Sequence, residues 1–399
     1  MGHQHVMGVY NAPAFDVASG DGVWLTDTKG RRYLDCVAGV ATTALGHCNP
    51  RLIAALQQQA RKVWHVSNIF GIPDQRKLAE RLTQACFADV AFFANSGTEA
   101  VETALKVARK YHAAAGHPER IDVIGFAGSF HGRTYAAVNA SGREAYLAGF
   151  GPRLPGYVQL TLDDEAGIAE AVARPTTAAV IVEPVQGEGG ARALSGEWLR
   201  RVRELTRAHG VLLIYDEVQC GMGRTGRLFA HQWFDGVEPD IMAIAKALGG
   251  GFPVGACLAT SNAAHGMTPG THGSTFGGNP LAMAVALAVL DEIANEATLA
   301  DVLTATDHVA QRLTNLQEQF PDVIGELRGK GLLIGLQLKT NNQEFMVHAR
   351  EEGLLIAGCG ENCVRLLPSL LISASEITEV WLRLKAACQR ARVSLADAA

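Results

Sequence analysis

Short runs of consecutive apolar residues alternate with longer amphipathic stretches through the middle of the chain. Helical stretches or long loops separate most of the runs, for example at 99–112 and at 196–209, where Ser195 is the expected N-cap. Strands that are apolar throughout and joined by helical crossovers predict an α/β fold, with a mostly parallel sheet covered by helices on both faces. The expected strands are residues 90–93, 123–126, 178–182, 211–215, 241–245 and 256–259.

The two ends of the chain have a different pattern. Residues 23–35 predict a hairpin, and Asn49 followed by Pro50 predicts the start of a helix. We expect an N-terminal segment (1–50) that is part of a small domain, a large domain (51–284) and a small α+β C-terminal domain (285–399). In the last of these and just before it, we expect helices at 280–294, 299–320, 343–352 and 375–393 and strands at 323–328, 332–338, 354–356 and 364–367.

The composition is that of an ordinary globular protein. Of 399 residues 48% are apolar, and 35 basic residues against 40 acidic ones give a net charge of −5. This mild acidity argues against a protein that binds nucleic acid or anionic membranes. The first residues lack the pattern of a signal peptide, and the longest apolar run (281–290) is too short to span a bilayer. We therefore expect a cytoplasmic protein.

The cysteine pattern predicts neither disulfides nor a metal site. Eight cysteines are present without a C-x-x-C pair, and Cys86 and Cys257 lie in apolar stretches, as reduced core cysteines of cytosolic proteins do. Cys359 and Cys363 are close enough to share a metal with a histidine, but no partner motif lies near them in the sequence. We expect no bound metal.

The strongest chemical signal lies where two expected strands end. Asp216 and Glu217 follow the strand at 211–215 and precede a glycine-rich loop, a pattern that on its own is more typical of a solvated strand end. Lys246 closes another strand, where an unpaired charge is costly. A lysine that forms an imine, beside an aspartate that keeps a pyridine nitrogen protonated, suits pyridoxal phosphate.

Such a cofactor also needs a phosphate site. Ser96, Gly97 and Thr98 open an expected helix, a pattern typical of an anion cradle and equally of a capping box without a ligand. The segment 273–279 has the same combination of glycines, hydroxyls and a helix start.

Three other segments carry groups that suit a planar cofactor and charged substrates. Phe130 is suited to stack on a ring and Arg133 to clamp a carboxylate. Glu183 and Glu188 lie on a glycine-rich strand exit, and Arg365 lies in a strand of the C-terminal part. Each of these is more often structural when taken alone, but together they cluster at successive strand ends.

These segments together resemble one enzyme family. The chain is similar nearly from end to end to the class III (ornithine-type) aminotransferases, and within them to bacterial members that act on acetylornithine. This resemblance implies pyridoxal-phosphate fold type I, with a seven-stranded type of sheet, and pyridoxal 5′-phosphate as cofactor. The matching motifs are GHCNP (46–50), SGTEA (96–100), FHGRT (130–134), EPVQGEGG (183–190), DEVQCGMGRTG (216–226), AKALGGGFPVGA (245–256) and GTHGSTFGGNPLA (270–282).

The resemblance implies a role for each candidate residue. Lys246 would attach the cofactor and then move the proton, and Asp216 would hold the ring nitrogen. Glu188 and Arg365 would form a pair that opens when Arg365 binds the carboxylate of glutamate or 2-oxoglutarate. Thr275 would reach the phosphate from the partner subunit, so that a homodimer shares the site. The implied cofactor-binding residues are Ser96, Gly97, Thr98, Phe130, Asp216, Glu217, Val218, Gln219, Lys246 and Thr275, and the implied substrate-binding residues are Arg133, Glu183, Glu188, Ser274 and Arg365.

The implied reaction is transamination of N-acetylornithine with 2-oxoglutarate, which yields N-acetylglutamate semialdehyde and glutamate in arginine biosynthesis. Ornithine-specific members carry a tyrosine where this chain has Val40, and the absence of that tyrosine favours an acylated amine. Thr42 and Thr43 depart from the Val-Asn pair usual in acetylornithine enzymes, which leaves the acyl group open. Succinylornithine, ornithine and 4-aminobutyrate are the alternative amines.

Two readings outside this reaction class are weaker. A nucleotide-binding protein of the doubly wound type would need a G-x-G-x-x-G loop between a strand and a helix, with an acidic residue about 20 residues further on. The stretch GMGRTG (221–226) has this spacing, but it lies inside the DEVQCGMGRTG motif that carries the aminotransferase resemblance. A catalytically silent homologue that serves as a binding module is disfavoured because Lys246 and Asp216 are both present.

Overall fold

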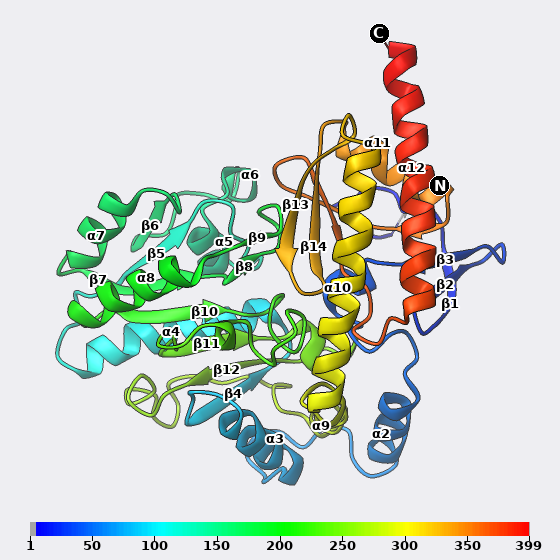
Figure 1. Ribbon diagram of the computed structural model, residues 1–399. Helices are drawn as coiled ribbons and strands as arrows, with labels where there is room; N and C mark the ends of the chain where they lie inside the picture. Colours follow the sequence, from blue (N-terminus) through cyan, green and yellow to red (C-terminus); the bar gives the residue numbers. More distant parts are fainter. Residues whose placement is uncertain (1–4, 399) are drawn as a thin grey trace.

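A seven-stranded sheet organises the part of the chain that follows the N-terminal hairpin (Figure 1). The computed structural model describes residues 5–398, and within them the strand order of this sheet is β4-β12-β11-β10-β7-β5-β6. All of these strands are parallel except β12, which runs antiparallel to both of its neighbours. The strands are β4 (Val90–Ala94), β5 (Asp122–Phe126), β6 (Tyr157–Leu160), β7 (Thr177–Val182), β10 (Leu212–Asp216), β11 (Ile241–Ile244) and β12 (Gly255–Ala259). The mostly parallel sheet predicted from the apolar runs is confirmed, and β6 is an additional strand.

Helices cover both faces of this sheet because alternate side chains of its strands point in opposite directions. In β7, Ala179 and Ile181 join the apolar cluster under α4 and α5, whereas Val180 and Val182 join the cluster that includes residues of α7 and α8. Every residue of β7 is buried, which explains its uninterrupted apolar sequence. These helices are α4 (Gly97–Ala114), α5 (Tyr135–Ser141), α7 (Glu165–Ala173) and α8 (Gly196–Ala208).

Helix starts follow the predicted capping residues. The Ser195 side chain accepts a hydrogen bond from the backbone N–H of Trp198 at the start of α8, and Asn49 caps α2 (Pro50–Ala60). A further pair of helices, α3 (Pro73–Gln84) and α9 (Pro280–Ile293), pack against one another beside β4. The short elements between the sheet strands are α6 (Glu144–Leu147), β8 (Val185–Gln186), β9 (Arg192–Ala193), and the 3₁₀ turns η1 (Ala230–Trp233) and η2 (Lys246–Gly249).

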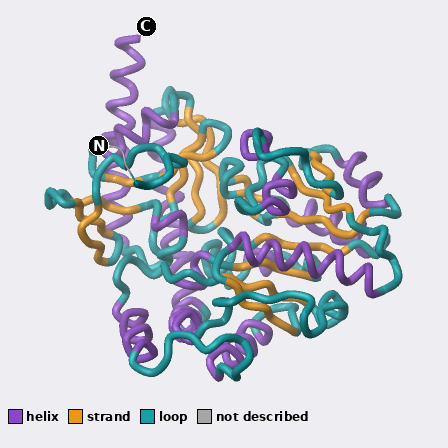
Figure 2. The backbone as a smooth tube through the Cα atoms, turned by 180° about the vertical axis from the view of Figure 1, so that it is seen from behind, coloured by secondary structure: helices purple, strands orange, loops and turns teal. Residues whose placement is uncertain are grey.

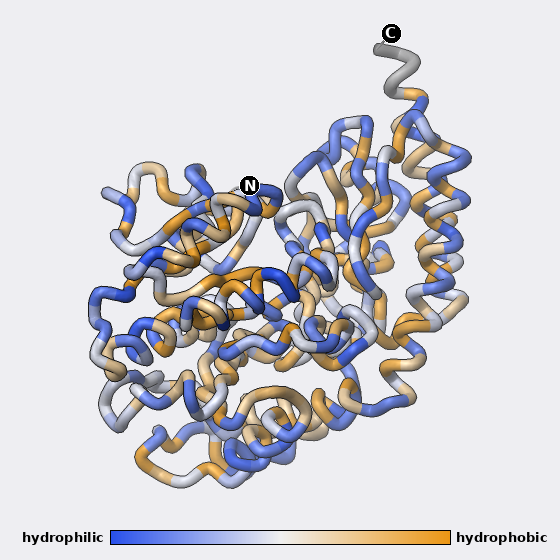
Figure 3. Tube along the Cα trace, turned by 60° about the vertical axis from the view of Figure 1, so that its left-hand side comes forward, coloured by the Kyte–Doolittle hydropathy of each residue, from blue (hydrophilic) through white to orange (hydrophobic). Residues whose placement is uncertain are grey.

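Two four-stranded sheets, the four-residue helix α1 and the helices α10, α11 and α12 lie beside the central sheet (Figures 1 and 2). One sheet has the order β13-β14-β17-β16, and the other, β1-β2-β3-β15, joins the N-terminal hairpin in parallel to a C-terminal strand. Helices α10 and α12 run side by side along this part, and α12 shows alternating apolar and polar positions (Figure 3). Their bounds are β1 (Val17–Asp21), β2 (Trp24–Asp27), β3 (Arg32–Asp35), α1 (Ala38–Ala41), α10 (Glu296–Gln319), β13 (Ile324–Lys330), β14 (Leu333–Leu338), α11 (Asn342–Glu351), β15 (Leu354–Leu355), β16 (Ala357–Cys359), β17 (Cys363–Leu366) and α12 (Ala374–Ala398).

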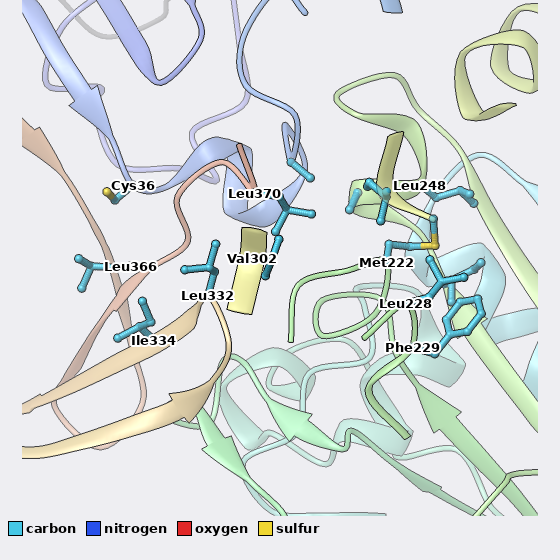
Figure 4. Close-up of a cluster of buried hydrophobic side chains, with 14 of the residues drawn as sticks. Cys36, Met222, Leu228, Phe229, Leu248, Val302, Leu332, Ile334, Leu366 and Leu370 are labelled. Carbon is cyan, nitrogen blue, oxygen red and sulfur yellow. The ribbon is translucent and has the colours of Figure 1, made fainter. Parts of the chain in front are cut away.

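A continuous apolar core joins the central sheet to the C-terminal strands (Figure 4). Met222 and Leu248, from loops beyond β10 and β11, belong to the same buried cluster as Val302 of α10 and Leu332 and Leu366 near or in the second sheet. Burial of apolar surface stabilises by about 25 cal/mol per Å², so this shared core holds the loops that follow β10 and β11 at a defined position. No helix in the described part of the chain combines the length and the apolar character needed to cross a bilayer.

Candidate active site

A cavity of about 410 Å³ lies where the parallel strands of the central sheet end. Its wall includes Asn95 after β4, Glu183 after β7, Asp216 at the end of β10 and Lys246 after β11. Because the carboxyl ends of parallel strands share one edge of a sheet, residues far apart in the sequence meet there. The lining residues are Thr42, Asn95, Ser96, Gly97, Thr98, Phe130, His131, Gly132, Arg133, Glu183, Glu188, Asp216, Val218, Gln219, Ala245, Lys246, Gly251, Phe252, Pro253 and Val254.

Lys246 presents its amine to this cavity from the first position of η2. Its backbone has φ of 43°, a left-handed conformation that is uncommon for a residue other than glycine. Among the described residues, none makes a hydrogen bond or ion pair with its Nζ. Burial and the positive charge of Arg365 lower the pKa of Lys246, while the carboxylates of Asp216, Glu188 and Glu183 oppose the shift. A lowered pKa increases the fraction of Lys246 that is present as the neutral, nucleophilic amine.

Asp216 is held in the cavity wall by two hydrogen bonds. Its Oδ2 lies 2.7 Å from Nδ1 of His131, and its Oδ1 accepts from the backbone N–H of Val218 at 3.0 Å. Burial acts to lower the pKa of His131, but the hydrogen bond and the charge of Asp216 outweigh it, and the net shift is upward. The Nε2 atom of His131 is buried without a partner among the described residues. His131 therefore fixes the orientation of the Asp216 carboxylate, and Asp216 still lines the cavity.

The start of α4 contributes a row of backbone N–H groups. Ser96 caps this helix: its Oγ accepts from the N–H of Glu99 at 3.3 Å and donates to a carboxylate oxygen of Glu99 at 2.8 Å. Within residues 5–398 no acceptor is recorded for the N–H groups of Gly97 and Thr98, which are free to bind an anion. The Ser96 cap and the free N–H groups of the anion cradle therefore coexist in the same turn.

Close packing around this turn explains two glycines. A Cβ on Gly97 would lie 2.7 Å from a methyl group of Val218, and one on Gly132 would lie 2.1 Å from Oγ1 of Thr98. Gly132 also has φ of 129°, which other residues rarely adopt. The FHGRT loop (130–134) therefore packs directly against the first turn of α4.

Arg365 lies on β17 of the second sheet, behind the wall of the cavity. It is 2% exposed, and its Nη2 donates to Oε1 of Glu188 at 2.5 Å while its Nη1 donates to Oε1 of Gln219 at 2.8 Å. No spacing rule in the sequence brings these residues together, because β17 joins the second sheet through its pairing with β14. An arginine held by a carboxylate and an amide at the cavity edge has the geometry to exchange them for a substrate carboxylate.

The family model for aminotransferase class III matches residues 7–388 of the chain. The chain is a class III aminotransferase. It is 61% identical over 392 residues to acetylornithine aminotransferase 2 of Caulobacter vibrioides, covering 98% of this chain and 97% of the relative. It is 52% identical over 385 residues to the acetylornithine aminotransferase of Mesorhizobium japonicum, covering 96% and 94%.

Solved structures of related enzymes agree with this assignment. The N-acetylornithine aminotransferase of Stenotrophomonas maltophilia superimposes with a TM-score of 0.85 at 38% identity, covering 96% of this chain and 98% of the other. An ornithine aminotransferase of Toxoplasma gondii that holds pyridoxal phosphate at partial occupancy in its active site gives a TM-score of 0.92 at 34% identity, covering 98% and 93%. The aminotransferase therefore has fold type I and uses pyridoxal 5′-phosphate, as predicted.

The cavity of the aminotransferase fits this cofactor. Lys246 offers an amine without a partner, Asp216 offers a fixed carboxylate, and the start of α4 offers free N–H groups for a phosphate. These are the three groups that a pyridine ring with an aldehyde and a phosphate requires.

The structure places one expected cofactor residue outside the cavity. Glu217 is fully buried on the other side of β10, where its carboxylate accepts from the backbone N–H groups of Ala230 and His231 and from the His231 ring. The expectation that Glu217 binds the cofactor is wrong, because consecutive residues at the end of a strand point to opposite sides. Asp216 faces the cavity, so Glu217 faces away from it.

Two other expected residues lie near the cavity of the same chain but not in its wall. The Oγ of Ser274 accepts from the side-chain amide of Asn95 at 3.2 Å, which places it one hydrogen bond away. Thr275 is exposed on the adjoining loop. Arg365 likewise stands behind Glu188 and Gln219, whereas the remaining expected residues line the cavity themselves.

Sequence reasoning missed several residues of the cavity. His131 was expected to form local hydrogen bonds, and its bond to Asp216 is confirmed, but its place in the cavity wall was not foreseen. Thr42 and the segment 251–254 also line the cavity. The sequence signal for 251–254 was its position just before β12. Because β12 is antiparallel to its neighbours, it begins at the edge of the sheet where the parallel strands end.

Glu183 leads to a prediction about stability and pH. Burial and the nearby Asp216 charge raise the pKa of Glu183 from 4.5 to about 7, against the opposing effects of His131 and of two N–H donors. The contribution of Glu183 to stability is fully present below pH 4.5 and is lost as the pH rises through 7. Relative to Glu183→Gln, which does not titrate, we expect the cofactor-free wild type to lose about 3 kcal/mol across this range.

Urea unfolding of both proteins, at several pH values from about 4.5 to 8, measures this difference. Glu197→Gln, which changes an exposed carboxylate, is the control and should follow the wild type. A difference between wild type and Glu183→Gln that stays constant with pH would contradict the raised pKa.

Proposed function

We propose that this enzyme transfers the terminal amino group of N-acetylornithine to 2-oxoglutarate, which yields N-acetylglutamate semialdehyde and glutamate in arginine biosynthesis. The observation that carries the proposal is the high identity, over nearly the whole chain, to relatives named acetylornithine aminotransferases. The reaction also suits a cavity that offers a nucleophilic amine and, at its edge, two arginines for substrate carboxylates.

We assign the proton transfers to Lys246. Pyridoxal phosphate, when bound, supplies an electron sink for the pair left behind when the substrate carbon loses its proton. Lys246 Nζ takes that proton and returns it, for which its lowered pKa is suited. Asp216, positioned by its hydrogen bond with His131, would hold the ring nitrogen in its protonated form. The N–H groups of Gly97 and Thr98 bind the phosphate, with the Ser96 hydroxyl beside them.

The remaining cavity residues position the ring and the substrates. Val218, which packs against Gly97, and Phe130 would enclose the ring, and Gln219 would approach its hydroxyl group. Glu183 holds the Phe130 loop, because it accepts from the backbone N–H of Phe130 at 2.9 Å. Arg133 would bind the α-carboxylate of the amino donor. Its guanidinium lies over the ring of Tyr146 at 3.6 Å from the centroid, and no carboxylate among the described residues pairs with it.

We propose that the enzyme works as a homodimer in the cytoplasm. Trp64, Ile69, Phe70 and Phe276 are each more than half exposed, an apolar surface typical of a protein interface. Asn68 donates to the carbonyls of Ser274 and Gly277, which joins the two loops that carry this surface. Thr275 stands exposed in the same surface and would reach the phosphate of the partner, with Ser274 near the partner's substrate. The eight free cysteines fit a reducing compartment.

We also propose the division of the chain into an N-terminal segment (1–50), a large cofactor domain (51–284) and a small C-terminal domain (285–399). Pairing of β3 with β15 supports the assignment of the N-terminal hairpin to the small domain. Residues 1–4 and 399 of these units lie outside the described residues.

Turnover of the candidate amines with 2-oxoglutarate tests the proposed substrate. We expect kcat/KM for N-acetylornithine to exceed that for ornithine and for 4-aminobutyrate by about 10²-fold or more. In a site built for an acylated amine, the free α-ammonium group of ornithine is left without partners, and 4-aminobutyrate has no acylamino group to fill the same place. N-succinylornithine, assayed alongside, reports the acyl preference. A preference for 4-aminobutyrate would overturn the proposal.

Replacement of Arg365 by alanine should separate the two halves of the reaction. We expect kcat/KM for 2-oxoglutarate to fall about 10- to 100-fold, the value of one hydrogen-bonded charge pair. The half-reaction with N-acetylornithine should change much less, since Arg133 binds that substrate. Single-turnover absorbance of the cofactor measures each half, and Arg174→Ala, on the surface of α7, is the control. Equal losses in both halves would contradict the role of Arg365.

A further inference from the structure

Cys359 and Cys363 face one another across the hairpin that joins β16 to β17. The two strands are antiparallel, and the register places these residues directly opposite. Opposite residues in such a ladder have Cα atoms about 4.5–5.5 Å apart, within the range of about 4.4–6.8 Å that a disulfide spans. Both thiols are free in the structure. Joining them therefore requires little movement of the backbone.

The two thiols differ in reactivity. The pKa of Cys363 is lowered by its interaction with the neighbouring Cys359 thiol and by the charge of Arg328, whose Nη1 lies 3.9 Å from the Sγ of Cys363, although burial opposes the shift. The same interaction, together with burial, raises the pKa of Cys359. Other buried cysteines, such as Cys36 and Cys257, have a raised pKa through burial alone or with little opposition. Of the two thiols, Cys363 is the one whose deprotonated form a neighbouring guanidinium, that of Arg328, stabilises, and Cys359 lies beside it as a second thiol.

We infer that Cys359 and Cys363 form a reversible disulfide when the enzyme meets a hydroperoxide, and that this disulfide restrains the Glu188–Arg365 ion pair. The Cys363 thiolate attacks one oxygen of hydrogen peroxide, which breaks the O–O bond, forms a sulfenic acid and, with one proton, releases water. The Cys359 thiol then gives up its proton, and its sulfur attacks the sulfenic sulfur and displaces hydroxide, which leaves as a second water. Two thiols are oxidised by two electrons, one peroxide is reduced, and a dithiol reductant reverses the change.

The hairpin is bonded to both members of the ion pair. The backbone N–H of Gly360 donates to the carbonyl of Glu188 at 2.9 Å, and Nη2 of Arg365 donates to the carbonyl of Gly358 at 3.4 Å. Arg365 also follows Cys363 by two residues in β17, so both side chains leave the strand on the same face. A disulfide across this hairpin stiffens the backbone on which Arg365 exchanges Glu188 for a substrate carboxylate. This coupling rests on the proposed function, whereas formation of the disulfide does not.

Formation of the disulfide can be measured directly by mass analysis of one tryptic peptide. Trypsin releases residues 351–365 as one peptide that contains both cysteines. After treatment of the holoenzyme with hydrogen peroxide and alkylation, we expect this peptide to lose the mass of two hydrogen atoms and to escape alkylation until a dithiol is added. Cys359→Ser and Cys363→Ser should each abolish the product, and Cys48→Ser, which changes an exposed cysteine, should not. An alkylated, unoxidised 351–365 peptide under conditions that oxidise Cys48 would overturn the inference.

The consequence for the ion pair is measured on the same samples. We expect oxidation to raise the KM for 2-oxoglutarate about fivefold or more, the lower end of ordinary coupling between sites, with full recovery after reduction. The KM for N-acetylornithine should change less, and both serine variants should be insensitive to peroxide. A disulfide that forms and leaves both KM values unchanged would overturn the coupling. Absence of aminotransferase activity before oxidation would instead overturn the proposed function, and the peptide assay would still decide the disulfide.

Discussion

Replacement of Lys246 by alanine is expected to lower kcat by about 10⁴-fold or more, because one side chain both attaches the cofactor and moves the proton. Among the described residues, no neighbouring side chain is placed to take over these two roles. Glu183 is held by two backbone N–H groups, and Arg365 and Glu188 are engaged with one another. The variant should still fold, since removal of a cation from a place where burial lowers its pKa relieves an unfavourable charge.

Three measurements define this result. Steady-state turnover gives the loss of activity, circular dichroism shows that the fold persists, and borohydride reduction followed by peptide mass analysis locates the attached cofactor. In the wild type the adduct should lie on Lys246, and in Lys246→Ala it should be absent. Lys29→Ala, in the exposed turn of the N-terminal hairpin, should match the wild type in all three. An adduct on another lysine, or turnover within tenfold of the wild type, would contradict the assignment.

The strands were predictable where both faces of the sheet are covered. Residues 177–182 are all buried, so their apolar run stands out from the sequence around it. β6, at the edge of the sheet, is half-buried throughout and includes Gln159, and its run was not recognised. Apolar continuity is a signal of double-sided burial, and it is lost in β6, where that burial ends. The other edge strand, β4, keeps buried residues at its carboxyl end and was recognised.

The cavity residues were predictable for a related reason. Parallel strands deliver their carboxyl ends to one edge, so polar residues after several strands converge even though the sequence separates them. Glu217 was assigned wrongly to the cavity together with its neighbour Asp216, because alternation along the strand allows only one of the two to face the cavity. This error was avoidable from the sequence.

The position of Arg365 beside Glu188 could not be predicted in this way. Its approach to Glu188 depends on how the second sheet docks against the first, which is set by the shared apolar core and not by any local pattern. Its role was inferred from family resemblance alone. Contacts between distant segments, unlike strands and helix caps, carry no short-range signature in a single sequence.

Replacement of Asp216 by asparagine should lower kcat by about 10³-fold while the cofactor still binds. A charge about 4 Å from an opposite charge contributes about 4 kcal/mol at an effective dielectric constant of 20, and that energy is a factor of about 10³ in rate. Asparagine keeps the size of the side chain but cannot stabilise the protonated ring nitrogen. The anion cradle at Gly97 and Thr98 and the amine of Lys246 remain, so the variant should still form the borohydride adduct.

His131 makes this prediction specific to the electrostatic role of Asp216. Because Oδ2 of Asp216 and Nδ1 of His131 are 2.7 Å apart and buried, the two act as a unit, and removal of the histidine should matter little once the charge is gone. We expect His131→Asn to cost about 10-fold in the wild type and almost nothing in the Asp216→Asn background. Asp163→Asn, which changes an exposed carboxylate, controls for the loss of a negative charge. Additive losses in the double variant would show that His131 acts on its own, and would remove it as the residue that positions Asp216.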